Sequence, residues 1–338
     1  MTGLSDTFNR PINYLRISVT DRCNLRCIYC LPEDGVRLMN HHDILSYEEI
    51  ASVTRLAAEM GINKVRLTGG EPLVRANLPD LVSMLSRMEG IDDIALTTNG
   101  ILLKDYASEL KRAGLKRVNV SLDTLDEDKF ERITRRRKLS HVLEGIEAAR
   151  ACGLNPVKIN MVVMRGVNDG EIIDFARLSL SQGWHVRFIE LMPFNSEDPP
   201  EGHSAQTGGE FLPKFMPAEE IKKRLSNLGE LEPHVPMAGN GPARYFRFSR
   251  ATGTVGFITP VSQHFCVTCN RLRLTAEGKL RPCLLSDQEV DLRQSLRNGA
   301  SPEKLKQLIK QAVQKKPGKH QLAKGRVSSK RRMSQVGG

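Results

Sequence analysis

The chain alternates strand-like and helix-like segments from residue 14 to about residue 192, and this alternation limits the possible folds more than any other feature. Six short apolar runs predict strands. They cover residues 14–20, 64–68, 94–98, 117–122, 157–163 and 185–191. Helical segments separate them, and strand–helix units in series predict a parallel sheet with right-handed crossovers. Because six units are too few for a closed eightfold barrel, we expect an open, partial TIM-like (βα)6 barrel.

Polar motifs recur just after or at the ends of these strands. They are GGEP at 69–72, TTNG at 97–100, SLD at 121–123 and ELM at 190–192. In a parallel barrel such positions share one rim, where active sites form. The adjacent glycines of GGEP are expected to permit positive φ angles and the close approach of a ligand.

Three cysteines follow the first strand within one short loop. Cys23, Cys27 and Cys30 have the spacing C-x3-C-x2-C, and three thiolates so arranged can hold three irons of a [4Fe–4S] cluster. The fourth iron then lacks a protein ligand and is open to a small molecule. The alternative is a structural zinc site completed by His41 or His42, although C-x3-C is an unusual zinc knuckle.

A second set of three cysteines lies near the C-terminus. Cys266 and Cys269 form a C-x2-C pair, and a hairpin around 276–278 is expected to return Cys283 beside Cys269. Two incomplete sets in one chain favour two clusters, each with an open iron, and zinc completed by His264 or by water is the alternative. Cys152 has no partner at ligand spacing and is expected to be an ordinary thiol.

Two arginines lie within the second cysteine set, between Cys269 and Cys283. Arg271 and Arg273 are two residues apart on the first strand of the hairpin, so both side chains are expected on one face. Two guanidinium groups beside a cluster suit a phosphate-bearing ligand. An exposed, charged strand face is the alternative.

The region after the sixth strand predicts a second, smaller α+β domain that carries the second cluster. Residues 195–216 are rich in Pro, Gly and Ser and predict a long surface loop. Beyond it we expect helices at 217–228, 288–297 and 301–315 and strands at 243–249 and 254–259. The predicted organisation is a barrel domain over 1–216, a C-terminal domain over 217–320 and a basic tail over 321–338.

The net charge of +11 is a property of the tail. Residues 301–338 contain eleven Lys or Arg and one acidic residue, so the rest of the chain is nearly neutral. A basic tail is usually solvated or flexible, and with 5% aromatic residues available for base stacking we expect no nucleic-acid partner. No apolar run reaches the ~18–20 residues that span a bilayer, and the N-terminus has no signal pattern. We therefore expect a cytoplasmic monomer or homodimer without a membrane partner.

These motifs together resemble the radical S-adenosylmethionine superfamily, which is marked by C-x3-C-x2-C with Tyr29 inside it, by GGEP and by a six-unit partial barrel. Other segments look like the GTP 3′,8-cyclase family of molybdenum-cofactor biosynthesis. They are LRIS-T-RCNLRC-YC, KVRLTGGEPL-R, VRFIELMPF, HFC-TCNRLRLTA-GKL-CL and the terminal Gly337-Gly338. The resemblance covers essentially the whole chain.

The resemblance implies a lyase that converts GTP into (8S)-3′,8-cyclo-7,8-dihydroguanosine 5′-triphosphate. In that family the first [4Fe–4S] cluster binds S-adenosylmethionine, and one electron from a low-potential donor releases a 5′-deoxyadenosyl radical that abstracts the C3′ hydrogen of GTP. The second [4Fe–4S] cluster binds the guanine ring. Cyclic pyranopterin monophosphate synthase consumes the product, and the Gly-Gly terminus is threaded into the active site.

The same resemblance assigns roles residue by residue. The cluster ligands are Cys23, Cys27 and Cys30 for the first cluster and Cys266, Cys269 and Cys283 for the second. The positions that contact S-adenosylmethionine are Tyr29, Gly70, Ser121 and Met192. The positions that contact GTP are Arg16, Arg66, Thr97, Lys158, Arg271, Leu272 and Arg273, among which Arg16, Arg271 and Arg273 are the candidate catalytic residues.

Two rival functions stay open at this point. One is another radical S-adenosylmethionine enzyme with an auxiliary cluster, such as a peptide modifier, although those often carry more C-terminal cysteines. The other is a zinc-stabilised binding protein, for example for RNA through the basic tail. A pure electron carrier does not fit, because neither cysteine set has a fourth member.

Overall fold

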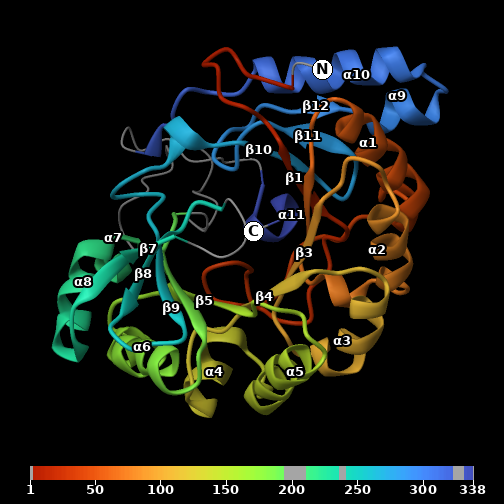
Figure 1. Ribbon diagram of the computed structural model, residues 1–338. Helices are drawn as coiled ribbons and strands as arrows, with labels where there is room; N and C mark the ends of the chain where they lie inside the picture. Colours follow the sequence, from red (N-terminus) through yellow and green to blue (C-terminus); the bar gives the residue numbers. More distant parts are fainter. Residues whose placement is uncertain (1–2, 194–210, 236–240, 323–330, 338) are drawn as a thin grey trace.

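A single twelve-stranded sheet organises the molecule. The computed structural model describes residues 3–193, 211–235, 241–322 and 331–337, so most of the expected loop at 195–216 and the terminal Gly338 lie outside the described residues. The strand order across the sheet is β12-β11-β10-β1-β2-β3-β4-β5-β6-β9-β8-β7. The sheet curves into an open barrel that carries helices on its outside (Figure 1).

Six parallel strands form the centre of this sheet, and each is paired with the next strand along the chain. They are β1 Tyr14–Ser18, β2 Lys64–Thr68, β3 Asp93–Thr98, β4 Arg117–Ser121, β5 Lys158–Val163 and β6 His185–Glu190. The helices between them are α1 Tyr47–Glu59, α2 Leu78–Ser86, α3 Leu103–Arg112, α4 Glu127–Thr134, α5 Leu139–Ala151 and α6 Ile172–Ser181. The prediction of an open, partial barrel is confirmed.

Strand β1 shows how the barrel acquires a polar interior. Leu15 and Ile17 are at most 1% exposed and belong to the apolar layer between sheet and helices. Side chains alternate between the two faces of a strand, so Arg16 points to the other face and lines the central cavity. An ordinary barrel of this kind fills its interior with branched apolar residues, whereas this one places a guanidinium group there.

The C-terminal region extends the same sheet at both edges. Beside β6 lie β9 Thr254–Ile258, which is parallel to it, and then β8 Arg244–Phe248 and β7 Leu231–His234. Beside β1 lie β10 Arg271–Leu274, also parallel, and then β11 Lys279–Arg281 and β12 Val290–Asp291. The remaining helices are α7 Phe211–Lys214, α8 Ala218–Leu225, α9 Arg293–Arg297, α10 Pro302–Gln314 and α11 Met333–Val336. No described helix has the length and apolarity needed to cross a membrane.

The predicted elements of this region need two corrections. The expected helix at 288–297 begins instead as strand β12, which pairs with β11, and only Arg293–Arg297 is helical. Strand β7 lies in a stretch to which the sequence assigns no structure, because Leu-Glu-Pro-His has weak strand propensity and reaches the sheet only as an edge strand. Both errors come from pairing with a neighbouring strand, which overrides local propensity.

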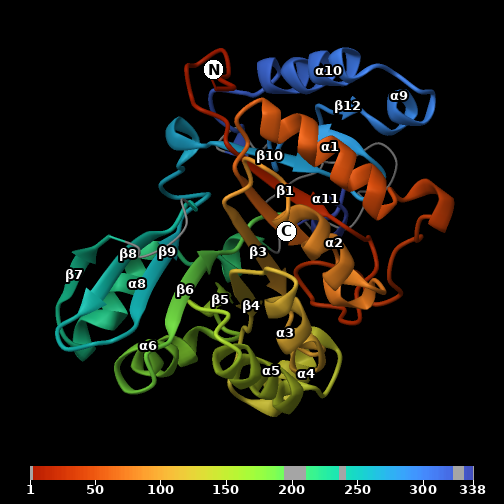
Figure 2. The same ribbon diagram turned by 45° about the vertical axis from the view of Figure 1, so that its right-hand side comes forward.

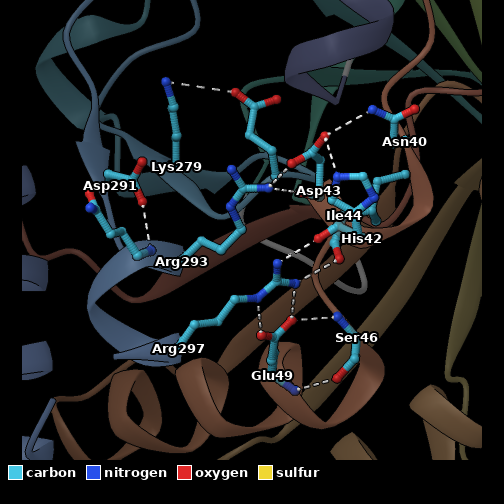
Figure 3. A network of polar contacts seen from close by, with 12 residues as sticks. Asn40, His42, Asp43, Ile44, Ser46, Glu49, Lys279, Asp291, Arg293 and Arg297 are labelled. Atoms are coloured by element: carbon cyan, nitrogen blue, oxygen red, sulfur yellow. Dashed lines mark hydrogen bonds and ion pairs between the residues drawn. The ribbon is translucent and has the colours of Figure 1, made fainter. Parts of the chain in front are cut away.

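Polar contacts fasten the C-terminal region to the first barrel helix (Figure 3). Arg297 Nε and Nη2 donate to the two carboxylate oxygens of Glu49, at 2.6 and 3.0 Å. Glu49 is also the capping-box residue of α1, since its carboxylate accepts from the backbone N–H of Ser46 at 2.7 Å. Lys306 on α10 forms a 2.6 Å ion pair with Glu59 at the other end of α1. Helices α9 and α10 therefore lie against α1 (Figure 2).

The last described residues enter the barrel. Helix α11 lies in the middle of the ring of strands in Figure 1, where the C-terminus is marked. Ser334 is 3% exposed and Val336 is 1% exposed. The expectation of a solvated basic tail is therefore wrong for residues 331–337, although residues 323–330 lie outside the described part of the chain. As far as residue 337, the structure bears out the expectation from the family resemblance that the tail is threaded into the barrel.

Candidate active site

One cavity of about 310 Å³ lies inside the barrel and is lined by both cysteine sets. Its walls come from strand ends, from the loops that follow them and from the C-terminal segment. The six cysteines that line it are Cys23, Cys27, Cys30, Cys266, Cys269 and Cys283. All of them are free thiols. Two sets that are more than 230 residues apart in the sequence therefore open on one shared space.

The GGEP motif supports the first cysteine loop through its backbone. The N–H of Gly70 donates to Thr20 O at 2.8 Å, and that of Glu71 donates to Arg22 O, also at 2.8 Å. A Cβ atom at Gly70 would lie 2.3 Å from Arg22 O, so no side chain fits between the two segments. Gly69 and Gly70 do not have positive φ angles. The expectation that these glycines adopt positive φ angles is therefore wrong. They are required because the backbone of another segment packs closely against them.

The cysteines of the first set are half-buried, and Cys23 and Cys27 pack against the apolar core. Burial raises the pKa of Cys23 to about 11 and that of Cys30 to about 12. The N–H of Leu25 donates to Cys23 Sγ at 3.4 Å, which favours the thiolate. Ionising such thiols requires a strong compensating charge, and iron supplies it in Fe–S proteins. The donor set therefore fits a cluster, although no three His, Cys, Asp or Glu side chains in the described chain converge on a point suited to one metal ion.

The second set is assembled by the predicted hairpin. Antiparallel pairing joins Arg273 to Arg281 and Leu274 to Leu280, and continuing this register puts Cys283 opposite Arg271. The guanidinium of Arg271 lies 3.7 Å from Cys269 Sγ. Burial acts to raise the pKa of Cys269, but the positive charges of Arg271 and Lys316 outweigh it and bring this pKa to about 6. Cys269 is therefore prepared to act as a thiolate ligand.

A row of buried arginines forms one wall of the cavity. Strand register puts Arg16 beside Arg273 on one side and beside Arg66 on the other. Burial, with Arg271 next in effect, lowers the pKa of Arg273 to about 10, and burial also lowers the pKa values of Arg16 and Arg66. Clustered, desolvated cations disfavour their own charged forms, so an anion of several charges would stabilise this wall.

Further polar atoms in the cavity wall have no hydrogen-bond partner within the described residues. They include Thr97 Oγ1, Asn160 Oδ1 and Nε of Arg66 and Arg187. A buried polar atom left unpaired costs about 1–3 kcal/mol. Such atoms around one cavity are typical of a site whose ligand supplies the missing partners.

The C-terminal segment contacts the arginine wall. The carbonyl oxygen of Gly337 accepts from Arg16 Nη2 at 3.1 Å and from Arg273 Nη1 at 2.7 Å. Gly337 has φ +69, and a Cβ there would lie 2.6 Å from Thr68 Cγ2. A glycine is therefore needed at position 337 for both its conformation and its close packing.

Most residues that the sequence assigned to the site line this cavity. Those assigned to S-adenosylmethionine are Tyr29, Gly70, Ser121 and Met192, and those assigned to GTP are Arg16, Arg66, Thr97, Arg271 and Arg273. The geometry brings them together, but their individual contacts stay predictions. His264, the possible zinc ligand, also lines the cavity, whereas His41 and His42 do not.

Two predicted GTP residues do not line the cavity. Leu272 is 1% exposed and packs in the apolar core, because it alternates with Arg271 and Arg273 along β10. Lys158 lies at the start of β5 with its Nζ 5.3 Å from the centroid of the Tyr245 ring. Burial, followed by the charge of Arg187, lowers the pKa of Lys158 to about 7. Because Lys158 is the first residue of β5, it lies away from the carboxyl ends of the strands, where the rim of the barrel is.

Sequence reasoning missed several cavity residues. Arg187 alternates with apolar neighbours in β6 as Arg16 does in β1, so the same pattern identifies it. Asp123, in SLD, accepts a 2.7 Å hydrogen bond from the Tyr29 hydroxyl and a 2.8 Å bond from the N–H of Val162. Lys316, at the end of α10, also lines the cavity, and no local pattern marks it. Cys152 is the half-buried C-cap of α5, as expected.

Two family descriptions match the chain in succession. Residues 17–179 match the Radical SAM superfamily, and residues 184–322 match the family described as Molybdenum Cofactor Synthesis C. Curated relatives named GTP 3′,8-cyclase match nearly the whole chain. The protein of Moorella thermoacetica is 53% identical over 99% of this chain and 100% of its own length, and that of Pelotomaculum thermopropionicum is 52% identical with the same coverage.

Solved structures show the same fold. SuiB of Streptococcus suis bound to S-adenosylmethionine superposes with a TM-score of 0.58 at 15% identity, covering 84% of this chain. This chain spans 64% of the length of the SuiB chain, and the likeness is one of fold alone. The fold, the cavity with its cysteine loop and the full-length relatives agree. The chain belongs to the radical S-adenosylmethionine superfamily and, within it, to the GTP 3′,8-cyclase family.

Proposed function

We propose that this chain is a lyase that converts GTP into (8S)-3′,8-cyclo-7,8-dihydroguanosine 5′-triphosphate, the first step of molybdenum cofactor biosynthesis. The observation that carries the proposal is the shared cavity: two cysteine sets and a wall of buried arginines face one space of about 310 Å³. A radical reaction on a nucleotide requires the reacting carbon and the radical source to be held at contact distance. One cavity lined by both cysteine sets supports that requirement.

In this proposal Cys23, Cys27 and Cys30 ligate the first [4Fe–4S] cluster. Such a cluster would supply one electron for the cleavage of S-adenosylmethionine, and the resulting 5′-deoxyadenosyl radical would abstract the C3′ hydrogen of GTP. Tyr29, Gly70, Ser121 and Met192 surround S-adenosylmethionine. The hydrogen bond from Tyr29 to Asp123 supports this arrangement, because it fixes the ring that lies between two ligand cysteines. The apolar surroundings of the loop exclude water from a reactive intermediate.

Cys266, Cys269 and Cys283 would hold a second [4Fe–4S] cluster, which would supply an iron site for the guanine ring. Arg16, Arg66, Arg271 and Arg273 hold the triphosphate, and Thr97 supplies a neutral donor. The lowered pKa values of the buried arginines support this assignment, since a polyanion relieves the repulsion among them. We add Arg187 to this set. Lys158, at the start of β5, contributes positive potential from outside the cavity lining. The side chain of Leu272 lies in the apolar core, so in the proposal this residue offers GTP only its backbone groups.

The proposal extends to the organisation of the chain and to its partners. Residues 1–216 form the radical domain, residues 217–320 carry the second cluster and residues 321–338 form the tail. A low-potential protein supplies the electron, and cyclic pyranopterin monophosphate synthase takes the cyclised nucleotide. In the structure, Arg16 and Arg273 donate hydrogen bonds to the carbonyl oxygen of Gly337. We propose that the same two arginines contact both the triphosphate and the tail.

An anaerobic assay of the reconstituted protein tests this function. GTP, S-adenosylmethionine and a strong reductant are mixed, and 5′-deoxyadenosine and the cyclised nucleotide are quantified together. GTP deuterated at C3′ should transfer its label to 5′-deoxyadenosine. Label retained in the nucleotide, or 5′-deoxyadenosine formed without any cyclised nucleotide by protein that carries both clusters, would refute the proposed reaction.

A further inference from the structure

We propose that Arg10 and Lys316 are positioning residues for the second cysteine set. Both are buried cations that touch the backbone beside the cysteines, and nothing in the family resemblance assigned them a role. Between them they donate to the carbonyl group of Cys266 and to carbonyl groups within two residues of Cys269 and Cys283. The inference rests on the proposed function, because it takes Cys266, Cys269 and Cys283 as cluster ligands.

Arg10 holds the first of the three cysteines. Its Nη1 donates to the carbonyl oxygen of Cys266 itself at 2.5 Å. The same guanidinium donates to Pro317 O at 2.8 Å and to Gly318 O at 3.2 Å. Asp6 orients it through a 2.6 Å ion pair to Nε, and Arg10 is only 6% exposed. One side chain thus ties the N-terminal segment, the Cys266 loop and residues 317–318 together.

Lys316 holds the other two cysteines. Its Nζ donates at 2.7 Å to Arg271 O, two residues after Cys269, and at 2.7 Å to Pro282 O, the residue before Cys283. Lys316 is 3% exposed and lines the cavity. It therefore bridges the two strands of the hairpin at the end that carries the cysteines. The C-terminal segment at 316–318 is the point where the Arg10 and Lys316 contacts meet.

These contacts explain how three loosely tethered thiolates keep one geometry. A C-x2-C turn and a hairpin end are flexible by themselves, and precise ligand placement requires support from outside the ligand set. Charge-assisted hydrogen bonds to carbonyl oxygens are about twice as strong as neutral ones. The buried positive charge of Lys316 also favours the thiolate form of Cys269, whereas the charge of Arg10 is balanced by Asp6. The ring of Phe8 packs directly against Gly318, where a Cβ would lie 2.9 Å from the ring.

The test compares Lys316→Met and Arg10→Lys with Cys266→Ala in the full-length, anaerobically reconstituted protein. Lys316→Met keeps the length of the side chain and removes its charge, while Arg10→Lys keeps the charge but cannot reach three carbonyl groups. Lys315→Met is the matched control, since Lys315 is the exposed neighbour on the same helix end. Iron content and the electron paramagnetic resonance spectrum of the reduced protein are recorded before and after addition of S-adenosylmethionine or GTP.

We expect iron to fall from about eight to about four atoms per chain in Lys316→Met and to an intermediate value in Arg10→Lys. The spectral change caused by S-adenosylmethionine should persist, and the change caused by GTP should be lost. The Lys315→Met control should match wild type. The preserved first cluster also verifies that the barrel of each variant is folded.

The outcomes separate this inference from the proposed function. If Cys266→Ala retains about eight irons, the second cluster itself is wrongly assigned. If Cys266→Ala loses about half of the iron while Lys316→Met and Arg10→Lys retain it with a wild-type GTP response, the positioning role is refuted. Loss of both clusters in Lys316→Met equally overturns the inference, because it indicates a general role in folding.

Discussion

Arg273→Met should weaken GTP binding while leaving the ligand-free fold about as stable as wild type. Arg273 lies between Arg16 and Arg281 in the register of the sheet and is 7% exposed. Burial, with the charge of Arg271, brings its pKa from 12.5 to about 10. This shift corresponds to about 3 kcal/mol against the charged form in the fold. Removing the charge releases that penalty.

The same substitution also removes favourable contacts. Arg273 Nη1 donates to Val336 O at 3.2 Å and to Gly337 O at 2.7 Å. A hydrogen bond to a charged group contributes about 1.5–3 kcal/mol. The two opposing effects are of similar size, so we expect the free energy of unfolding to change by less than about 1.5 kcal/mol. In the complex the guanidinium would face phosphate, and its removal should cost about 2–3 kcal/mol, or about 30- to 150-fold in Kd.

Two measurements check this reasoning. Urea unfolding of the cluster-free protein gives the stability, and anaerobic calorimetry of the reconstituted protein gives the Kd for GTP. Arg247→Met, at an exposed position on β8, is the matched control. A variant that binds GTP like wild type would refute the phosphate-binding role of Arg273. A large loss of stability or of iron would instead indicate that the arginine is structural.

Three further changes probe separate parts of the structure. Cys23→Ala should abolish formation of 5′-deoxyadenosine, measured by chromatography, and retained cleavage would contradict the assignment of the first cluster. Gly70→Ala should displace the cysteine loop, because its Cβ would lie 2.3 Å from Arg22 O, so iron of the first cluster should be lost while Gly170→Ala, which meets nothing within 4 Å, behaves as wild type. Lys158→Met should be more stable than wild type at pH 7, because the native pKa of Lys158 is lowered by burial to about 7 and its charged form is penalised. Above pH 7 the lysine is neutral in the native state but keeps its proton in the unfolded state, so the wild-type protein gains stability as the pH rises. The difference in unfolding free energy between the variant and wild type, measured with urea, should therefore narrow by up to about 1.4 kcal/mol per pH unit. A difference that does not depend on pH would show that Lys158 is not desolvated.

Much of the barrel could be predicted from the sequence because its signals are local. Apolar runs and helical periodicity identify the six central strands, and the polar motifs at their ends identify the rim. The C-x3-C-x2-C loop and the hairpin register also depend only on residues near one another. Arg16 could be placed in the interior from simple alternation with Leu15 and Ile17.

The features that the sequence did not predict depend on long-range contacts. The addition of β10 beside β1 joins segments separated by most of the chain, and β9 joins β6 from 69 residues further along. The role of Gly70 could not be derived from its neighbours, because the group that excludes a side chain is Arg22 O in another segment. Lys316 likewise lies in an ordinary lysine-rich helix end, and only the folded chain brings it to the hairpin.

The sheet topology also has a consequence for synthesis of the protein. When β6 has left the ribosome, both margins of the nascent sheet are bare, because the strands that cover them begin only at Thr254 and Arg271. Unpaired margins invite association with other chains, and domains generally fold as they emerge. The nascent sheet therefore keeps two association-prone edges until the final quarter of the chain arrives. Assembly of the second iron centre also has to wait for this final quarter, because all three of its cysteines lie there.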